Sequence, residues 1–488
     1  MPSNTITDNN NNSNNTPIQK IFQGKNILVT GGTGFIGMVL IEKLLRDCGD
    51  LQTIHMIVRP NKGKQPEERV KELFSNVLFS KLLEKNPSAV SKVNVIQGDL
   101  SKENMGIESQ EQLEQIKTSV SFVFNCAANV KFNDRLDKSL NANVVSLHHL
   151  LRFAHTMTSL KSFIHLSTAY SQCHLSHIEE KFYPSVADPM SLIQTLETMT
   201  PEDIEKITPV LMGQRPNTYT LTKSIAEALL SKESAGLPVA LIRPSIVGGL
   251  ASDPLPGWSA NLNGPSGIYV AAGNGFLKAI IHSAKKGNFD LIPVEYCVNM
   301  MIAVAWKLAT NPVQEPIVYN CVSSSTNPLS FELHRKLTEK MVSKHGKTET
   351  GRKRSASLSL VSESKYKLVY DPLLHQLPAS IYDTVRELKG QDPVAKKAVK
   401  RLNAAVDAFT FFTTHSWEWE DENAKKLIQE LSESDKVIFN MDLTRLDWKT
   451  YLKTYYVGSL KYLHFPLAAK RAALSSSSTS ALSSASVL

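Results

Sequence analysis

The stretch TGGTGFIG at residues 30–37 decides the fold of this chain. It follows the apolar run 26–30 and precedes a helical pattern, and its three spaced glycines allow a tight turn, close approach of a pyrophosphate and helix–strand packing. A lone glycine triplet is a weak signal, but its place between a strand and a helix predicts a nicotinamide-dinucleotide site. We expect this loop to bind the cofactor through Gly31, Thr33, Gly34, Phe35, Ile36 and Gly37.

Short apolar runs alternate with longer helical patterns from this loop to about residue 289, which is typical of βαβ units. The expected strands are 26–30, 53–58, 93–97, 122–125, 162–167 and 239–242. Several are apolar at consecutive positions, as strands covered by helices on both faces are. The sequence therefore predicts an α/β fold: a Rossmann-type, doubly wound parallel sheet with a smaller substrate region and a helical C-terminal domain.

Composition divides the 488 residues further. We expect a disordered Asn-rich tail at 1–20, an NADP-binding Rossmann domain at 21–290 and a flexible Ser/Ala-rich tail at 467–488. Between them lie a substrate region at 291–384 and an aromatic-rich helical domain at 385–466. A basic, Ser-rich stretch at about 334–367 is interpreted as a partly mobile surface insert.

Charge and cysteine usage limit the function classes. The net charge of +8 is compatible with nucleic acid, an anionic membrane or a phosphate-bearing substrate, and we take it as weak support for an anionic ligand. The five cysteines are scattered without a C-x-x-C pair, so we expect no disulfide framework, no metal site and a reducing compartment. We also expect no secretory leader, no run of about 18 apolar residues that would span a membrane, and no peroxisomal S-K-L terminus.

Arg59 suggests which nicotinamide cofactor binds. An NAD-selective site normally has an acidic residue at the end of the second strand, where it binds the ribose hydroxyls. This chain has Arg59 there, followed by Lys62 and Lys64. A guanidinium pairs with a 2′-phosphate that a carboxylate would repel, so the sequence favours NADPH over NADH.

Tyr219 and Lys223 form a Y-x-x-x-K pair at the start of a helical pattern, which puts both on one helix face. A neighbouring ammonium is expected to lower the pKa of the tyrosine and so prepare it for proton transfer. A hydroxyl at the end of an earlier strand would share the substrate oxygen with the tyrosine. Ser167 and Thr168 are the candidates, and we favour Thr168, which gives a catalytic set of Thr168, Tyr219 and Lys223.

With GDL at 98–100, NCAA at 125–128 and RPSIV at 243–247, these motifs resemble the extended short-chain dehydrogenase/reductase superfamily over roughly residues 24–294. The resemblance implies that Lys223 hydrogen-bonds the nicotinamide ribose and that Asn143 supports the active-site network. Besides Tyr219 and Lys223, it implies a cofactor cleft that includes Asp99, Leu100, Ala127, Ala128, Pro244, Ile246 and Val247.

Further blocks look like the fatty acyl-CoA reductase (male-sterility) family: IVRP at 57–60, NVKFN at 129–133, HLSTAY at 165–170 and IEEKFYP at 178–184. PGWSANLNGPSG at 256–267, LIPVEYCVN at 291–299 and the segments 411–427 and 434–463 are similar to later blocks of that family. Two departures are Glu295, where the family usually has Asp, and the basic stretch near 334–367. The region 192–216 is expected to help form an acyl channel or lid.

The resemblance implies an NADPH-dependent enzyme that reduces long-chain fatty acyl-CoA through an aldehyde to a primary alcohol and releases CoA. Alternatives are an enzyme that stops at the aldehyde, a sugar-nucleotide or steroid-type extended short-chain dehydrogenase, and a catalytically silent scaffold. The expected substrate partner is fatty acyl-CoA, with no nucleic acid and with room for peripheral membrane association. We expect an intracellular protein, cytoplasmic or bound peripherally to peroxisome or endoplasmic reticulum; organelle, chain length and oligomeric state stay open.

Overall fold

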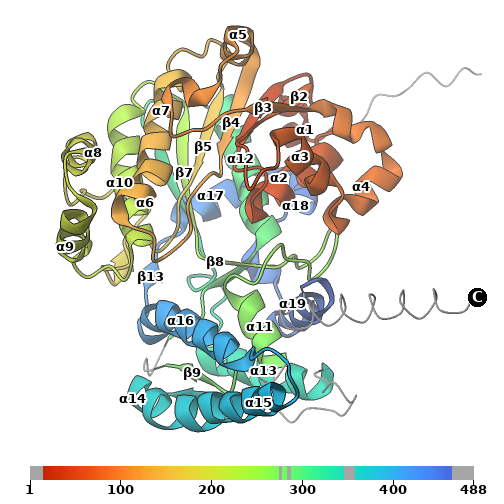
Figure 1. Ribbon diagram of the computed structural model, residues 1–488. Coiled ribbons are helices and arrows are strands. Elements are labelled where there is room, and N and C mark those ends of the chain that lie inside the picture. Colours follow the sequence, from red (N-terminus) through yellow and green to blue (C-terminus); the bar gives the residue numbers. More distant parts are fainter. Residues whose placement is uncertain (1–14, 274–276, 283–286, 346–357, 464–488) are drawn as a thin grey trace, which may run out of the picture.

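The computed structural model describes residues 15–273, 277–282, 287–345 and 358–463 (Figure 1). Its main sheet has seven parallel strands in the order β11-β7-β5-β4-β1-β2-β3. These strands are β1 (Asn26–Thr30), β2 (Thr53–Val58), β3 (Val93–Gln97), β4 (Val120–Asn125), β5 (Ser162–Leu166), β7 (Val239–Pro244) and β11 (Ile317–Cys321). The predicted Rossmann-type parallel sheet is confirmed, and all six expected strands belong to it.

Alternate side chains of each strand enter two different cores, which is why the strands are apolar at consecutive positions. In β1, Ile27 and Val29 pack with α2 (Phe35–Asp47) and α12 (Val294–Thr310) on one face. Leu28 packs with α5 (Gln110–Ser119), α7 (Ser146–Ala154) and α10 (Thr218–Glu233) on the other face. The sheet is therefore buried between two helical layers.

The main sheet continues beyond residue 290, the expected end of the Rossmann domain. Strand β11 pairs with β7, from Ile317 opposite Ala240 to Cys321 opposite Pro244. The chain reaches β11 through α12, which packs against the sheet. The region predicted to bind substrate thus also supplies the seventh strand.

A smaller part, made mostly of helices, lies below the sheet in Figure 1. It contains α11 (Pro265–Gly273), α13 (Phe331–His345), α14 (Glu363–Lys365), the π-helical η5 (Tyr366–Gln376), α15 (Leu377–Leu388) and α16 (Ala395–Thr414). Short strand pairs accompany it: β8 (Ile246–Gly248) with β10 (Leu291–Pro293), β9 (Ala279–Ile281) with β12 (Ser359–Val361), and β6 (His177–Ile178) with β13 (Glu418–Trp419). The chain then continues through α17 (Glu422–Glu430), α18 (Glu433–Ile438) and α19 (Trp448–Tyr462).

Shorter helices complete the described chain. They are α1 (Pro17–Phe22), α3 (Pro66–Phe74), α4 (Ser80–Lys85), α6 (Leu136–Leu140), α8 (Pro189–Glu197) and α9 (Pro201–Met212), with the π-helical turn η4 (Asn141–Val145). Single 3-10 turns occupy η1 (Val77–Phe79), η2 (Pro87–Lys92), η3 (Glu103–Gly106) and η6 (Leu443–Arg445). Within the described ranges, every helix is too short or too polar to cross a membrane.

The prediction of a disordered tail at 1–20 is wrong for its last residues. Residues 1–14 lie outside the described part, but α1 begins at Pro17 after a Thr16–Gln19 capping box. Ile18 and Phe22 of this helix are fully buried in the core beside α12. Two buried apolar side chains and a capped first turn stabilise a helix that composition alone did not reveal.

The stretch at 334–367 is also more ordered than predicted. Residues 334–345 belong to α13, which packs against α19, and Ser359–Val361 form β12 against β9. Residues 346–357, and the predicted flexible tail at 467–488, lie outside the described residues. The lysines of α13 occupy its exposed positions, and Phe331, Met341 and Val342 are buried.

Candidate active site

The predicted cofactor residues lie along the side of the sheet where the parallel strands have their carboxyl ends, called the cofactor edge below. The glycine loop follows β1, Arg59 follows β2, Asp99 and Leu100 follow β3, and Ala127 and Ala128 follow β4. Pro244 is the last residue of β7, and Ile246 and Val247 lie in β8. The strand order reverses between β1 and β4, and ligands of doubly wound folds bind at such a switch point.

Gly31 and Gly37 are required by the close packing of the loop. Gly31 has φ +67°, and a Cβ there would lie 2.6 Å from the backbone nitrogen of Ala127. A Cβ on Gly37 would lie 2.8 Å from the Cα of Gly32. The loop is therefore pressed between the end of β4 and the first turn of α2, and only glycine fits at these two positions.

The first turn of α2 fits a dinucleotide phosphate. The helix has thirteen residues, its N-cap Gly34 makes no side-chain cap, and its first turn contains no acidic residue. The amides of Phe35, Ile36 and Gly37 at this end have no partner within the helix, and they carry the positive end of the helix dipole. Backbone amides of this kind bind phosphate, so the loop suits the pyrophosphate of a nicotinamide cofactor.

A buried polar row joins the ends of three neighbouring strands. The Thr30 hydroxyl donates to Asn125 Oδ1 over 2.6 Å, and Asn125 Nδ2 lies 2.9 Å from His165 Nδ1. Thr30 Oγ1 also accepts a hydrogen bond from the Ala127 amide, at 3.3 Å. Burial, and secondly the charge of Lys223, hold the pKa of His165 well below its usual value, so its ring is neutral. The row fixes β1, β4 and β5 against one another beneath the cofactor edge.

Two arginines, not one, lie at the expected site of the 2′-phosphate. Arg59 is exposed after β2. Arg69 of α3 donates to the Arg59 carbonyl at 2.5 Å and to the Thr33 hydroxyl of the glycine loop at 3.0 Å. Burial, and then the charge of Arg59, lower the pKa of Arg69. No spacing rule identifies Arg69 from the sequence, because its position depends on the turn between β2 and α3.

Thr168, Tyr219 and Lys223 come together at the end of β5. The side chains of Thr168 and Tyr219 are hydrogen-bonded to each other. The Lys223 ammonium donates to the Leu166 carbonyl over 2.8 Å, and burial lowers its pKa to about 8. Thr168 and Lys223 are buried and Tyr219 is half-buried, so a bound carbonyl at this place would meet two hydroxyls.

The expected effect of Lys223 on Tyr219 is not what the structure shows. Burial raises the pKa of Tyr219 to about 12, and the Thr168 hydrogen bond offsets only part of this shift. The Lys223 ammonium instead points to the Leu166 carbonyl. Tyr219 is therefore protonated at neutral pH, the state that a proton donor requires.

Ser167, the alternative to Thr168, has a different partner. Its hydroxyl donates to Glu227 Oε1 over 2.6 Å. Glu227 is fully buried and accepts from Arg243 Nε at 3.0 Å and from its Nη2 at 2.8 Å. Glu227 is eight residues after Tyr219 on α10, so the helical spacing of Tyr219, Lys223 and Glu227 was a signal that sequence analysis did not use.

Asn143 connects the loop at 129–134 to α10. Its Nδ2 donates to Thr222 Oγ1 at 3.0 Å and to the Asn129 carbonyl at 3.2 Å. Its Oδ1 accepts from the Asn129 amide at 2.7 Å. Asn143 lies in the π-helical turn and is buried, so it positions this loop instead of facing solvent on a helix surface.

An aromatic wall covers Tyr219. Phe132, from the loop that Asn143 holds, stacks on Tyr219 with ring centroids 5.8 Å apart and an interplanar angle of 22°. Phe132 in turn contacts Phe409 and Phe412 of α16. Helix α16 of the C-terminal region therefore contacts the aromatic ring that covers Tyr219, a contact that no motif in the sequence indicates.

An apolar cavity of about 440 Å³ begins at this wall. It lies between α11, β9 and α16 and reaches from Val394 along α16 to Phe409 and Thr413. Lys397 and Arg401 are the charged residues of its lining. Residues 192–216, predicted to help form an acyl channel or lid, lie mostly in α8 and α9, and neither helix lines this cavity.

Two family models described as "Male sterility protein" match residues 29–301 and 374–465. The chain is 39% identical over 449 residues to fatty acyl-CoA reductase 1 of Homo sapiens, across 91% of this chain and 86% of that protein. The chain belongs to the fatty acyl-CoA reductase family. Fatty acyl-CoA reductase 1 of Xenopus laevis and fatty acyl-CoA reductase 2 of Mus musculus are 38% and 37% identical, with the same coverage. This fatty acyl-CoA reductase family member is therefore an oxidoreductase, as the sequence motifs predict.

Solved structures with the same fold are reductase domains of peptide-assembling enzymes. The terminal R domain of the myxalamid biosynthetic pathway has a TM-score of 0.61 at 17% identity, covering 91% of this chain and 92% of that one. The R domain of a nonribosomal peptide synthetase from Mycobacterium tuberculosis has a TM-score of 0.58 at 15% identity, with 90% and 92% covered. At these identities the likeness shows the fold of the fatty acyl-CoA reductase chain and nothing further.

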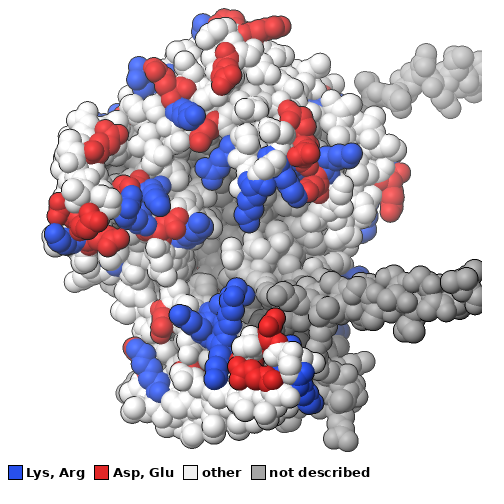
Figure 2. Space-filling view, in the orientation of Figure 1, with Lys and Arg blue, Asp and Glu red and all other residues white. Residues whose placement is uncertain are grey.

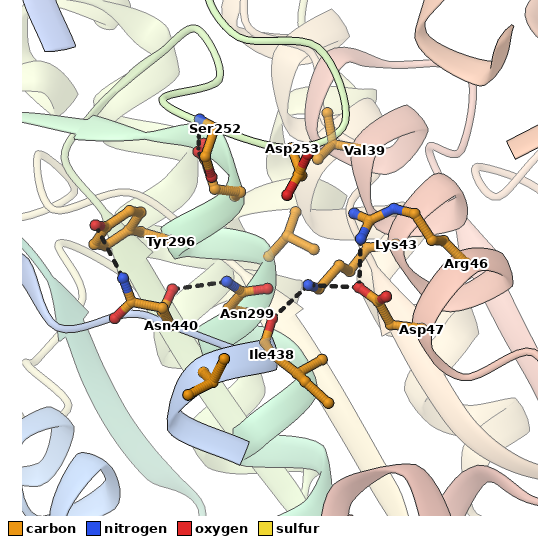
Figure 3. A pocket seen from close by; sticks show the side chains of 13 residues that line it. Val39, Lys43, Arg46, Asp47, Ser252, Asp253, Tyr296, Asn299, Ile438 and Asn440 are labelled. Carbon is orange, nitrogen blue, oxygen red and sulfur yellow. Dashed lines mark hydrogen bonds and ion pairs between the residues drawn. The ribbon is translucent and has the colours of Figure 1, made fainter. Parts of the chain in front are cut away.

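Glu295 lies at a second cavity of about 260 Å³ that is polar (Figure 3). Its Oε1 accepts from the amides of Ala251 and Ser252 at 2.7 and 2.8 Å, whereas its Oε2 has no protein partner. Burial raises the pKa of Glu295 to about 7. Across the cavity the Lys43 ammonium donates to the Ile438 carbonyl, so the reductase joins α2 to the C-terminal region here. None of the predicted cofactor or catalytic residues lines this cavity.

Proposed function

We propose that this enzyme uses NADPH to reduce a long-chain fatty acyl-CoA through an aldehyde to a primary alcohol, with release of CoA. The observation that carries the proposal is the apolar cavity that begins at the aromatic wall over Tyr219. Its volume of about 440 Å³ is within the usual range of small-molecule pockets, and its lining is almost entirely apolar. An alkyl chain suits such a lining, whereas a sugar nucleotide would leave its hydroxyls unpaired there.

The two arginines support NADPH as the cofactor. A 2′-phosphate between Arg59 and Arg69 would meet two guanidinium groups, and no carboxylate follows β2 at this point. Thr33 would be held for the adjoining phosphate by its bond to Arg69. The glycine loop and the amides of α2 would hold the pyrophosphate.

The side chains around Tyr219 suit reduction of a thioester carbonyl. When bound, the nicotinamide supplies hydride. Thr168 and Tyr219 stabilise the developing oxyanion, and Tyr219 donates a proton to it, which gives a hemithioacetal. As the C–S bond breaks, the carbonyl re-forms, the hydroxyl proton returns to Tyr219, and the CoA thiolate leaves and takes up a proton. A second hydride and the Tyr219 proton then convert the aldehyde into the alcohol.

Basic residues at the cavity are suited to the phosphates of CoA. Lys397 and Arg401 line the cavity, and both are exposed on α16. Figure 2 shows Lys and Arg gathered over α16 on the lower side of a hollow, with further Lys and Arg above it near the cofactor edge. We infer that the acyl chain enters the cavity while the CoA phosphates stay at this basic rim. The proposed place of action is inside the cell, in the cytoplasm or at the surface of the peroxisome or endoplasmic reticulum.

The test follows NADPH oxidation with palmitoyl-CoA or stearoyl-CoA in the wild type and in a Lys397→Ala/Arg401→Ala variant. We expect acyl-dependent oxidation in the wild type and a KM for acyl-CoA raised about tenfold in the variant, with kcat changed far less. Lys426→Ala, an exposed lysine of α17, is the matched control and should leave KM unchanged. An unchanged KM in the double variant would remove the basic rim from the account.

A further inference from the structure

The outward face of α15 is apolar. Among the described residues, seventeen large hydrophobic side chains are exposed, and nine of them lie between Leu368 and Leu388. The stripe has Ile381 at 58% exposure and Leu388 at 83% exposure, and its other members are Leu373, Leu374, Leu377 and Val385. Exposed apolar surface that gathers in one place marks an interaction site more often than scattered residues do.

The helical spacing explains why these side chains point away from the protein. From Leu377 on, residues three or four apart share a face of the helix, which groups Leu377, Ile381, Val385 and Leu388. The opposite face contains buried Ala379 and Asp383. Asp383 accepts hydrogen bonds of 2.8–2.9 Å from the first amides of α16, at residues 394, 395 and 396. The polar side of α15 is thus fixed inward and its apolar side is left outward.

Cations lie at both ends of this stripe. Lys365 and Lys367 precede it, Lys367 in an ion pair with Glu363, Lys389 follows it, and Lys396 and Lys400 are exposed on the neighbouring helix α16. In Figure 2 the lower end of the molecule is largely uncharged, and both basic and acidic side chains lie above and beside it. A helix with one apolar face and flanking Lys and Arg is the kind that lies in the interface of an anionic membrane.

The stripe is connected to the catalytic pocket through α16. Helix α15 packs along α16. Val394, whose amide donates a hydrogen bond to Asp383, is at one end of the apolar cavity. Phe409, fifteen residues on and so about 22 Å along the helix, is at the other end, beside Phe132 over Tyr219. One end of the cavity therefore lies close to α15, and the other ends at Phe409, which contacts the Phe132 ring over Tyr219.

We propose that the continuous apolar face of η5 and α15, from Leu373 to Leu388, docks on an anionic lipid bilayer. It would place the nearby end of the cavity at the membrane, where a long-chain substrate or product partitions. The role in substrate transfer rests on the proposed function, whereas the docking itself does not.

The test measures flotation of the full chain with vesicles of phosphatidylcholine and phosphatidylserine at 7:3, and with phosphatidylcholine alone. We expect binding to the mixed vesicles, weakened about tenfold without phosphatidylserine because the flanking cations lose their partners. Ile381→Gln/Leu388→Gln should lower the partition coefficient at least about tenfold, since two apolar side chains no longer enter the bilayer. Val210→Gln/Val437→Gln is the matched control, because these valines are 80% and 77% exposed elsewhere, and it should bind like the wild type.

Three outcomes overturn the proposal: no binding by the wild type, equal binding by all variants, or a wild-type dimer that Ile381→Gln/Leu388→Gln dissociates, which would make the stripe a subunit interface. Sedimentation velocity without vesicles distinguishes the last case. Circular dichroism should show the same helical content in every variant, since both substituted positions are exposed. A separate assay measures NADPH oxidation with decanoyl-CoA in the absence of vesicles. No oxidation by the wild type would count against the proposed function, not against docking.

Discussion

The Ser167 hydroxyl donates to Glu227 Oε1 over 2.6 Å, whereas Thr168, the next residue, is hydrogen-bonded to Tyr219. Two adjacent hydroxyls thus have separate partners. Glu227 also forms a fully buried ion pair with Arg243, at 2.8 Å. The end of β5, which presents Thr168 to Tyr219, is therefore connected through Ser167 to a charge pair in the core.

Glu227→Gln should destabilise the fold strongly. It leaves the buried Arg243 guanidinium without its carboxylate, and breaking a buried pair on one side costs about 3–5 kcal/mol. Urea unfolding measures the loss of stability. Glu197→Gln, at an exposed position of α8, is the control and should change stability little. The additional change Arg243→Gln should restore part of the loss, and a double variant as unstable as the sum of both singles would show that the pair is not coupled.

Tyr219→Phe should retain cofactor binding and lose turnover by at least about 100-fold, the usual effect of removing an acid–base group. The ring that stacks on Phe132 is kept, so only the proton and the Thr168 hydrogen bond are lost. Fluorescence titration with NADPH and steady-state turnover measure the two effects. Near-normal turnover would take Tyr219 out of the mechanism.

Arg59→Ala and Arg69→Ala should each raise the KM for NADPH much more than the KM for NADH. Each removes one guanidinium from the proposed 2′-phosphate site, which NADH does not occupy. Arg69→Ala should also affect NADH slightly, because it releases Thr33 of the glycine loop. Lys71→Ala, exposed on the same helix α3, is the control. Equal effects on both cofactors would mean that neither arginine contacts the 2′-phosphate.

Glu295 should make stability fall with rising pH. Burial raises its pKa to about 7 in the folded chain, above the model-peptide value of about 4.3. A raised carboxyl pKa means that the folded state binds the proton more tightly, so its contribution is complete below pH 4 and is lost as pH rises through 7. Glu295→Gln removes this dependence. Its free energy of unfolding, relative to that of the wild type, should therefore rise by on the order of 2 kcal/mol from pH 5.5 to pH 8. Urea unfolding at the two pH values checks this. If the difference in unfolding free energy between variant and wild type is the same at both, the pKa of Glu295 is not raised.

The sequence was sufficient for six strands of the main sheet, because each is apolar at consecutive positions and is bounded by turn residues. It did not reveal β11, whose five residues IVYNC carry no motif and are recognisable only by pairing with β7. It brought Thr168, Tyr219 and Lys223 into one group because strand ends and helical spacing determine their positions. Arg69, Phe132 and Phe409 were not found, since their places depend on a turn, a loop and the packing of α16 against a distant part of the chain.

The proposed enzyme activity is reduction of a fatty acyl thioester to an alcohol with NADPH. The most direct measurement incubates the enzyme with palmitoyl-CoA, counts NADPH oxidised and free thiol released, and identifies the lipid by gas chromatography. We expect hexadecanol as the product, with two NADPH oxidised for each CoA thiol released. Accumulation of hexadecanal at one NADPH per thiol would contradict the alcohol product, and a folded, NADPH-binding protein without acyl-dependent oxidation at any chain length would contradict the whole account.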